Sequence, residues 1–96
     1  MSETRKAMMD KLDAKVELAG ARLNLLRAKA RDAEADQRVK LNEKIRELES
    51  RRDDASDQLD RLKDASGDAW QDLRDGAEEA WQSLSSAVSD ATARYQ

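Results

Sequence analysis

The hydrophobic residues of this chain recur at helical spacing over most of its length. On a helical wheel of about 100° per residue, a series of apolar residues falls within an arc of roughly 100°, and we expect the other faces to be polar. The series consists of Met8, Leu12, Val16, Ala19, Leu23, Leu26, Ala30 and Ala33. The same arc continues without a change of phase to Leu62, with Gln37 and Arg52 as its only strongly polar members. This pattern predicts an amphipathic α-helix that packs against other helices.

The preserved phase favours one long coiled-coil helix over residues 1–66. The segment from Asp32 to Asp36 contains no Gly, Pro or Asn that would turn the chain, and a hairpin has no reason to keep its two helices in phase. The alternative is a monomeric three-helix bundle with helices of matching length, near residues 3–33, 37–65 and 68–95. Such a bundle has to bury Gln37 and Arg52 or place them at its rim.

A boundary between two helical segments is predicted near Ser66. Gly67 is placed to close the first helix in a left-handed conformation, and Asp68 can cap the next helix with Gln71 in a capping box. We therefore divide the chain into two parts, a long coiled-coil helix over 1–66 and a shorter amphipathic helix over 67–96.

The second segment repeats at eleven residues. The indole of Trp70 recurs at Trp81, and each is followed three positions later by a leucine. An eleven-residue period is typical of nearly straight helix packing and also of a helix that lies flat on a surface. Tryptophans at this spacing are interpreted first as packing anchors in a helical bundle.

The chain thus has two apolar stripes, the arc of the first segment and the Trp- and Leu-containing face of the second. A straight helix cannot bury its own stripe. Isolated helices are close to balance in water, so burial of the stripe has to supply the stability, of order 20 kcal/mol for the first helix. That helix would be ~90 Å long, more than the second could cover. We expect self-association, as a homodimer, a larger bundle or an open polymer. The predicted association face comprises Met8, Leu12, Val16, Leu23, Leu26, Leu41, Ile45, Leu48, Leu59, Leu62, Trp70, Leu73, Trp81, Leu84, Val88 and Tyr95.

Composition and charge limit the kind of fold and the classes of partner that we expect. The chain has 96 residues, of which 41% are charged and only three are aromatic, which suits thin packing of helices rather than a thick core. Residues 67–96 carry two Arg against six acidic residues, whereas residues 1–66 are nearly balanced. This charge distribution disfavours the phosphates of nucleic acids and the surface of anionic membranes.

Candidate chemistry is scarce. The sequence contains no histidine and no cysteine, which excludes disulfides, thiolate nucleophiles and catalysis by histidine, and disfavours a zinc site. Neighbouring carboxylates such as Glu78 and Glu79 point about 100° apart on a helix and do not converge on a metal ion. We expect no enzymatic activity, no cofactor, no metal and no small-molecule substrate. Without a run of ~18 apolar residues or the apolar core of a signal peptide, the expected location is the cytoplasm.

Two segments resemble a known family. Two parts of the chain are similar to small bacterial coiled-coil proteins described as stress-response proteins. They are the opening Met1–Ala7 with Met9–Leu12, and the junction Ser66–Leu73 followed by Gly76 and Ala80-Trp81. The resemblance implies a cytosolic, non-enzymatic, self-associating helical protein. It transfers no catalytic or binding residue to this chain.

Two classes of function follow from these observations. The first is a structural or interaction module that self-associates through its apolar stripes and scaffolds, sequesters or protects partners under stress. The alternative is a peripheral lipid-surface protein, in which the second helix leaves the bundle and lays its Trp face on a membrane or a lipid droplet. The aromatic face suits that alternative, whereas the acidic polar face of the same helix does not.

Overall fold

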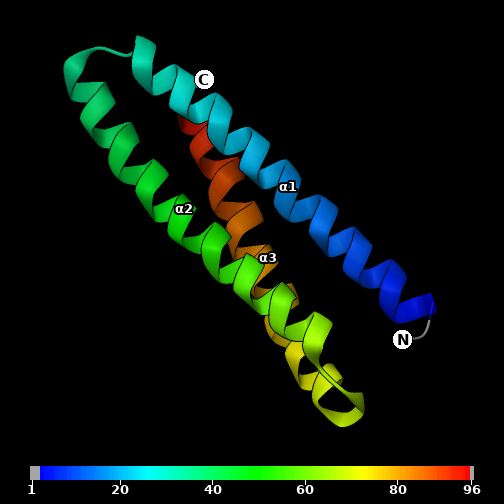
Figure 1. Cartoon of the computed structure of the whole chain (residues 1–96). Coiled ribbons are helices and arrows are strands. Elements are labelled where there is room, and N and C mark those ends of the chain that lie inside the picture. The colour runs from blue at the N-terminus through cyan, green and yellow to red at the C-terminus, as the bar shows by residue number, and fades with distance from the viewer. Residues whose placement is uncertain (1–2, 96) are drawn as a thin grey trace.

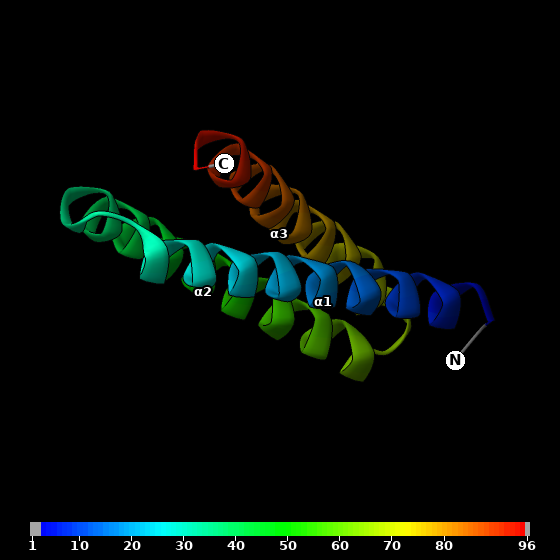
Figure 2. The ribbon, with the colours of Figure 1, turned by 90° about the horizontal axis from the view of Figure 1, so that it is seen from above.

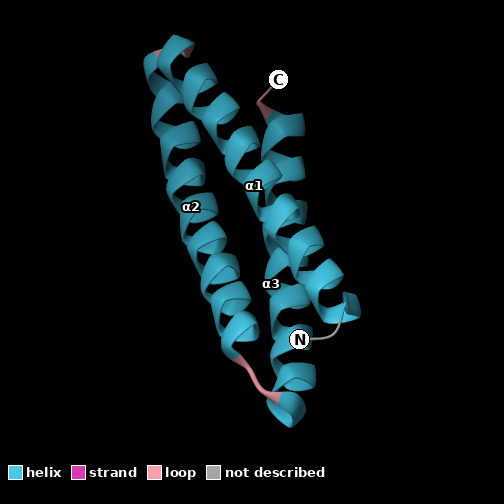
Figure 3. Ribbon diagram, turned by 45° about the vertical axis from the view of Figure 1, so that its right-hand side comes forward, coloured by secondary structure: helices cyan, strands magenta, loops and turns pink. Residues whose placement is uncertain are grey.

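The computed structural model describes residues 3–95, and over this range the chain is helical except for short connections (Figure 1). The three helices are α1 (Glu3–Asp32), α2 (Ala35–Asp64) and α3 (Gly67–Arg94). Each runs antiparallel to the one before it, and Figure 3 shows the two loops that join them at opposite ends. The chain therefore forms an elongated three-helix bundle that measures 51 × 17 × 17 Å.

The prediction of one continuous helix over residues 1–66 is wrong. Glu34 leaves the helical conformation with φ −64° and ψ 157°, and the chain reverses direction between α1 and α2. An unbroken helix over the same residues would be about 90 Å long, whereas the longest dimension of the molecule is 51 Å. The observed arrangement is the alternative with three helices of similar length.

One side chain bridges the turn between α1 and α2, and charged residues of opposite sign flank it. The carbonyl of Ala33 accepts a hydrogen bond from Arg38 Nη2 at 2.9 Å. Lys29 and Arg31 occupy the last turn of α1, and Asp36 occupies the first turn of α2. Basic residues stabilise helix C-termini and acidic residues stabilise helix N-termini. This reversal of charge is a sequence signal of the turn that the prediction from hydrophobic phase did not use.

The second connection lies where the sequence places it, but its caps differ from the prediction. Residues Ala65 and Ser66 are both extended, with ψ of 139° and 156°, and they separate α2 from α3. Gly67 is the first residue of α3 and does not adopt a positive φ, so the left-handed assignment is wrong. Ser66 takes the N-cap position in place of Asp68, without a side-chain capping bond. Because two extended residues already redirect the chain, no left-handed residue is needed.

The core consists of two hydrophobic clusters that follow one another along the bundle. The cluster nearer the α1–α2 turn contains Ala19, Leu23, Leu26, Ala30, Leu41, Ile45, Leu48, Ala55, Leu84, Ala87, Val88 and Ala91. The other contains Met9, Leu12, Leu59, Leu62, Trp70 and Ala77. Trp81 packs against both clusters and connects them. Among the described residues, every buried one is hydrophobic.

The two polar members of the apolar arc lie at the rim of the bundle. The side chain of Arg52 is half-buried and passes over Gly20, and its Nη2 reaches Asp53 Oδ1 at 3.2 Å. Gln37 is exposed beside the α1–α2 turn. A long side chain can cover apolar surface with its stem while its charge stays in water. The three-helix arrangement therefore accommodates both residues without burying a charge.

Ion pairs between α1 and α2 support this packing from outside. Arg27 Nη2 lies 2.8 Å from Glu49 Oε1, and Lys63 Nζ lies 3.0 Å from Asp13 Oδ2. Each of these side chains is about a third or more exposed. Exposed pairs contribute at most ~1 kcal/mol each, so the apolar clusters supply most of the stability.

Arg51 connects α2 to α3 and helps to lower the pKa of a neighbouring carboxyl group. Its Nη1 donates a hydrogen bond to Ser83 Oγ at 2.6 Å, and its Nη2 lies 3.0 Å from Glu47 Oε1. Hydrogen bonds from Arg51 and Lys44 hold the pKa of Glu47 below its usual value. Because Glu47 is exposed, this pair anchors the position of Arg51 more than it stabilises the fold.

Candidate association surface

The residues predicted as an association face lie inside the single chain. Eleven of them are buried in the two clusters: Leu12, Leu23, Leu26, Leu41, Ile45, Leu48, Leu59, Leu62, Trp70, Leu84 and Val88. Five are half-buried: Met8, Val16, Leu73, Trp81 and Tyr95. The sequence pattern omitted Met9, which is buried while Met8 is not. The two stripes cover each other within one chain. The need for a second chain to bury them, which followed from the continuous helix, therefore disappears.

The two tryptophans are core residues with cations over their rings. Trp70 is 4% exposed, and the guanidinium carbons of Arg5 and Arg74 lie 4.8 and 5.9 Å from its ring centroid. Lys15 Nζ lies 5.3 Å from the centroid of Trp81. Among the described residues, the buried Nε1 of Trp70 has no hydrogen-bond partner. The rings therefore act through apolar burial and cation–π contacts rather than through a hydrogen bond from Trp70.

A second apolar stripe lies on the outer face of α1, and sequence reasoning missed it. We call it the outer stripe, and it consists of Ala14, Leu18, Ala21, Leu25 and Ala28. All five residues are exposed, Leu18 by 49% and Leu25 by 65%. On the helical wheel the stripe is centred about 180° from the buried Leu23. The expectation that only one face of this helix is apolar is therefore wrong.

The spacing of the outer stripe is its sequence signal. Its members follow one another by alternating steps of four and three residues, which is the heptad spacing of helices that pair. The larger residues of the buried arc masked this second pattern on the same helix. Its two leucines are not singly scattered apolar residues, because Ala21 lies between them and Ala14 and Ala28 extend the stripe at its two ends.

Two rows of mostly charged residues flank the outer stripe, one of mixed charge and one basic. The row on the α2 side begins with the acidic residues Asp10 and Glu17 and continues with Asn24 and Arg31. The row on the α3 side is basic throughout and consists of Lys15, Arg22 and Lys29. On a helical wheel the two rows lie about 40–100° from the centre of the stripe, one on each side. An apolar stripe between rows of charge is a pattern typical of helices in coiled coils.

A third large exposed apolar residue, Val39 on α2, has a different setting. Its side chain is 59% exposed. Its neighbours at three and four positions along the helix are Ala35, Asp36, Asn42 and Glu43. It therefore stands alone in a mostly polar surface, and isolated apolar residues of this kind are common.

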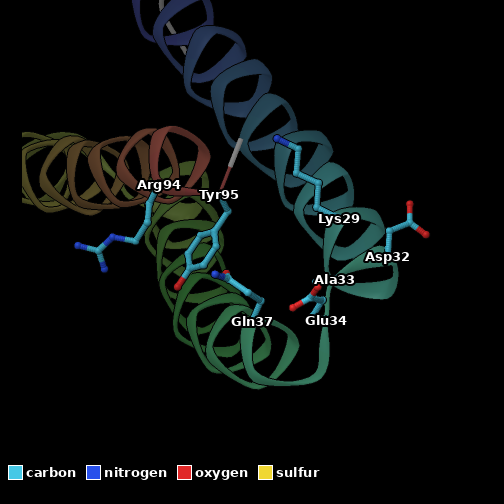
Figure 4. A pocket seen from close by; sticks show the side chains of 7 residues that line it. All are labelled: Lys29, Asp32, Ala33, Glu34, Gln37, Arg94 and Tyr95. Atoms are coloured by element: carbon cyan, nitrogen blue, oxygen red, sulfur yellow. The ribbon is translucent and has the colours of Figure 1, made fainter.

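A pocket of about 420 Å³ lies at the end of the bundle where α3 stops beside the α1–α2 turn (Figure 4). It is lined by Lys29, Asp32, Ala33, Glu34, Gln37, Arg94 and Tyr95. In Figure 4 the carboxylate of Asp32 and the guanidinium of Arg94 point away from its centre. The charged groups do not converge on a common point, as the recognition of a small ligand requires.

Two further kinds of site are absent from the described part of the chain. No group of three or more acidic side chains in residues 3–95 is placed to hold a metal ion. No helix within that range is long and apolar enough to cross a membrane.

Comparisons with protein-family models, with curated proteins and with solved structures found no match for this chain. The resemblance to bacterial stress-response proteins therefore stays a prediction from the sequence motifs. The candidate surface is defined by the geometry of α1 alone.

Proposed function

We propose that this protein is a non-enzymatic, self-associating helical interaction module that acts in a stress response in the cytoplasm. The observation that carries this proposal is the outer stripe, because α1 is apolar on two opposite faces and only one of them is covered within the chain. A helix that is apolar on both sides normally has neighbours on both sides.

The bundle suits the presentation of such a surface. The inner face of α1 packs on α2 and α3, which hold the helix in place over 30 residues. The outer stripe is then displayed on a helix that is already formed, so a partner does not have to supply the free energy of ordering it. This preorganisation supports a role in scaffolding or sequestering partners.

The other parts of the proposal have separate support. The absence of histidine and cysteine from the sequence favours a role without catalysis, and the absence of cysteine is compatible with a reducing compartment. The stress-related setting comes from the similarity of two sequence motifs, the opening residues and the junction at Ser66–Leu73, to a family of stress-response proteins.

Self-association is tested by measuring molar mass by light scattering over a concentration series in the micromolar to millimolar range. We expect the wild-type mass to rise from that of one chain toward a multiple of it. Leu25→Glu should shift the midpoint to a concentration about tenfold higher or more, because a leucine is worth ~1.5 to 3 kcal/mol when buried and each 1.4 kcal/mol is a factor of ten. Val39→Glu, an equal change outside the stripe, should leave the midpoint in place.

A wild-type protein that keeps the mass of a single chain over the whole range contradicts the proposal. Equal shifts for Leu25→Glu and Val39→Glu would contradict the assignment of the outer stripe, since a general effect of added charge would then explain both. Circular dichroism of each variant shows whether the helices are intact.

The alternative function is a peripheral lipid-surface protein, which the placement of both tryptophans on one face of α3 favours. In the bundle this face points inward, and Trp70 is 4% exposed, so lipid binding requires α3 to leave α1 and α2. We expect blue-shifted Trp emission in buffer that does not change when anionic or neutral vesicles are added. A further blue shift caused only by vesicles would replace our proposal with the alternative.

A further inference from the structure

We infer that a second copy of this chain docks on the outer stripe with its α1 parallel to the first. This pairing rests on the proposed self-association and specifies its surface, its orientation and its register. The two rows that flank the stripe indicate that the docked partner is a second copy of this chain. Their charges are complementary when two copies of α1 lie side by side.

The outer stripe has the composition of a close helix contact. Leu18 and Leu25 occupy one of the two core positions of a heptad, and Ala14, Ala21 and Ala28 occupy the other. The distance between packed helices depends on the side chains at the contact, and alanine allows a short one. In a parallel pair each leucine then packs against the same leucine of the other copy, and each alanine against the same alanine.

In a parallel pair of helices, the residue that directly precedes the leucine position of each heptad faces the residue five positions later on the partner helix. Applied to the two rows, this rule brings together Asp10 with Lys15, Glu17 with Arg22, and Asn24 with Lys29 of the second copy. The first two contacts join opposite charges, and two-fold symmetry forms each of them twice. Four favourable ion pairs therefore line one contact.

An antiparallel pair has the opposite outcome on the basic side. With Ala21 at its centre, the basic row of one copy faces the basic row of the other, so Arg22 meets Arg22 and Lys15 meets Lys29. On the other side, only Asp10 finds an opposite charge. Like charges at helix contacts are destabilising by about as much as opposite charges are stabilising. The sum of these contacts favours the parallel orientation.

The rest of the bundle leaves room for this pairing. Figure 2 shows α1 lying across α2 and α3 on one side of the molecule, and the outer stripe is on the side of α1 away from them. The basic row borders α3, where Lys15 contacts Trp81 and Arg22 lines a shallow depression with Ser89. Both side chains are long enough to turn toward a carboxylate at the edge of the stripe.

The contact is small, and this sets its strength. Two leucines and three alanines from each copy supply less area than the ~800 Å² that each partner contributes to a stable interface. We expect a weak, reversible dimer whose population follows the protein concentration.

Exchange of charges tests the register. Glu17→Arg and Arg22→Glu should each raise the dissociation constant about tenfold, because each converts two attractive contacts into repulsive ones. The double variant Glu17→Arg/Arg22→Glu restores opposite charges and should return the dissociation constant to near that of the wild type. Glu43→Arg, which makes the same change of net charge at an exposed position of α2, serves as the control and should have no effect.

Disulfide trapping tests the orientation. The chain contains no cysteine, so Ala14→Cys introduces one thiol. In the parallel pair the two copies of this position are adjacent, and oxidation should give a covalent dimer. In an antiparallel pair position 14 faces position 28, so only a mixture of Ala14→Cys and Ala28→Cys would cross-link. That result would overturn the inference.

The two proposals fail in different ways. A wild-type protein that remains a single chain removes both. Self-association that ignores the charge exchange, and that gives no covalent dimer with Ala14→Cys, overturns the parallel pairing while self-association itself stands.

Discussion

Leu23→Ala is expected to lower the free energy of unfolding by about 3 kcal/mol, whereas Leu25→Ala should change it by less than about 0.5 kcal/mol. Only one residue separates the two positions on α1. Leu23 is nevertheless 0% exposed, in the larger cluster, whereas Leu25 is 65% exposed. Removing the first side chain leaves a cavity between three helices. Shortening the exposed side chain of Leu25 leaves no cavity, and alanine is at least as good a helix former as leucine.

Urea denaturation followed by circular dichroism measures both values. The protein should be kept at low micromolar concentration, so that an association through the outer stripe does not add to the stability of the wild type. A loss for Leu25→Ala as large as that for Leu23→Ala would contradict the observed direction in which α1 faces its neighbours.

Trp70→Ala is expected to cost about 3–5 kcal/mol, the second large effect. The indole is 96% buried between the ends of the three helices and packs with Leu12, Leu59 and Leu62. Trp70→Phe should cost clearly less. It keeps an aromatic ring in the cluster, and the indole Nε1 that it removes makes no hydrogen bond to the described residues.

Thermal and urea unfolding of the two variants provide this comparison. The control is Trp81→Ala, which removes the same side chain from a half-buried position and should cost less than Trp70→Ala. If Trp70→Phe were as costly as Trp70→Ala, the indole N–H would have to be hydrogen-bonded, and the apolar account of this side chain would be wrong.

The helical character and most of the buried residues could be predicted from the amino-acid sequence. The apolar arc from Leu12 to Leu62 identifies the inner faces of α1 and α2, and every leucine and isoleucine on that arc is buried. The end of α2 near Ala65 was also predictable, since Ser66 and Gly67 interrupt good helix formers. Periodicity reports these features because it depends only on which side of a helix is removed from water.

The turn at Ala33 and Glu34 was not recognised, for a physical reason. Alanine and glutamate are good helix formers, and the chain reverses there through the extended ψ of one residue, Glu34. A common phase across the turn does not exclude a hairpin, because both helices face the same core. The charges of Lys29, Arg31 and Asp36 were the available evidence, and their contribution is small compared with that of packing.

The outer stripe shows the complementary difficulty. Leu18 and Leu25 are as hydrophobic as the buried leucines, and their heptad spacing is just as regular. Which of two apolar faces on one helix turns inward depends on the total area that each can bury against α2 and α3. This area is known only once those helices are in place.

By itself, the sequence determined that the chain forms amphipathic helices, that a helix begins near residue 67, and that its apolar side chains must be covered by other helices. These properties depend on local spacing and on the free energy of apolar burial. Only the tertiary structure decided that the cover comes from the same chain and that a second apolar face is left outside. Both depend on the reversal at Glu34, which shortens a rod of about 90 Å to a bundle of 51 Å and brings distant residues together.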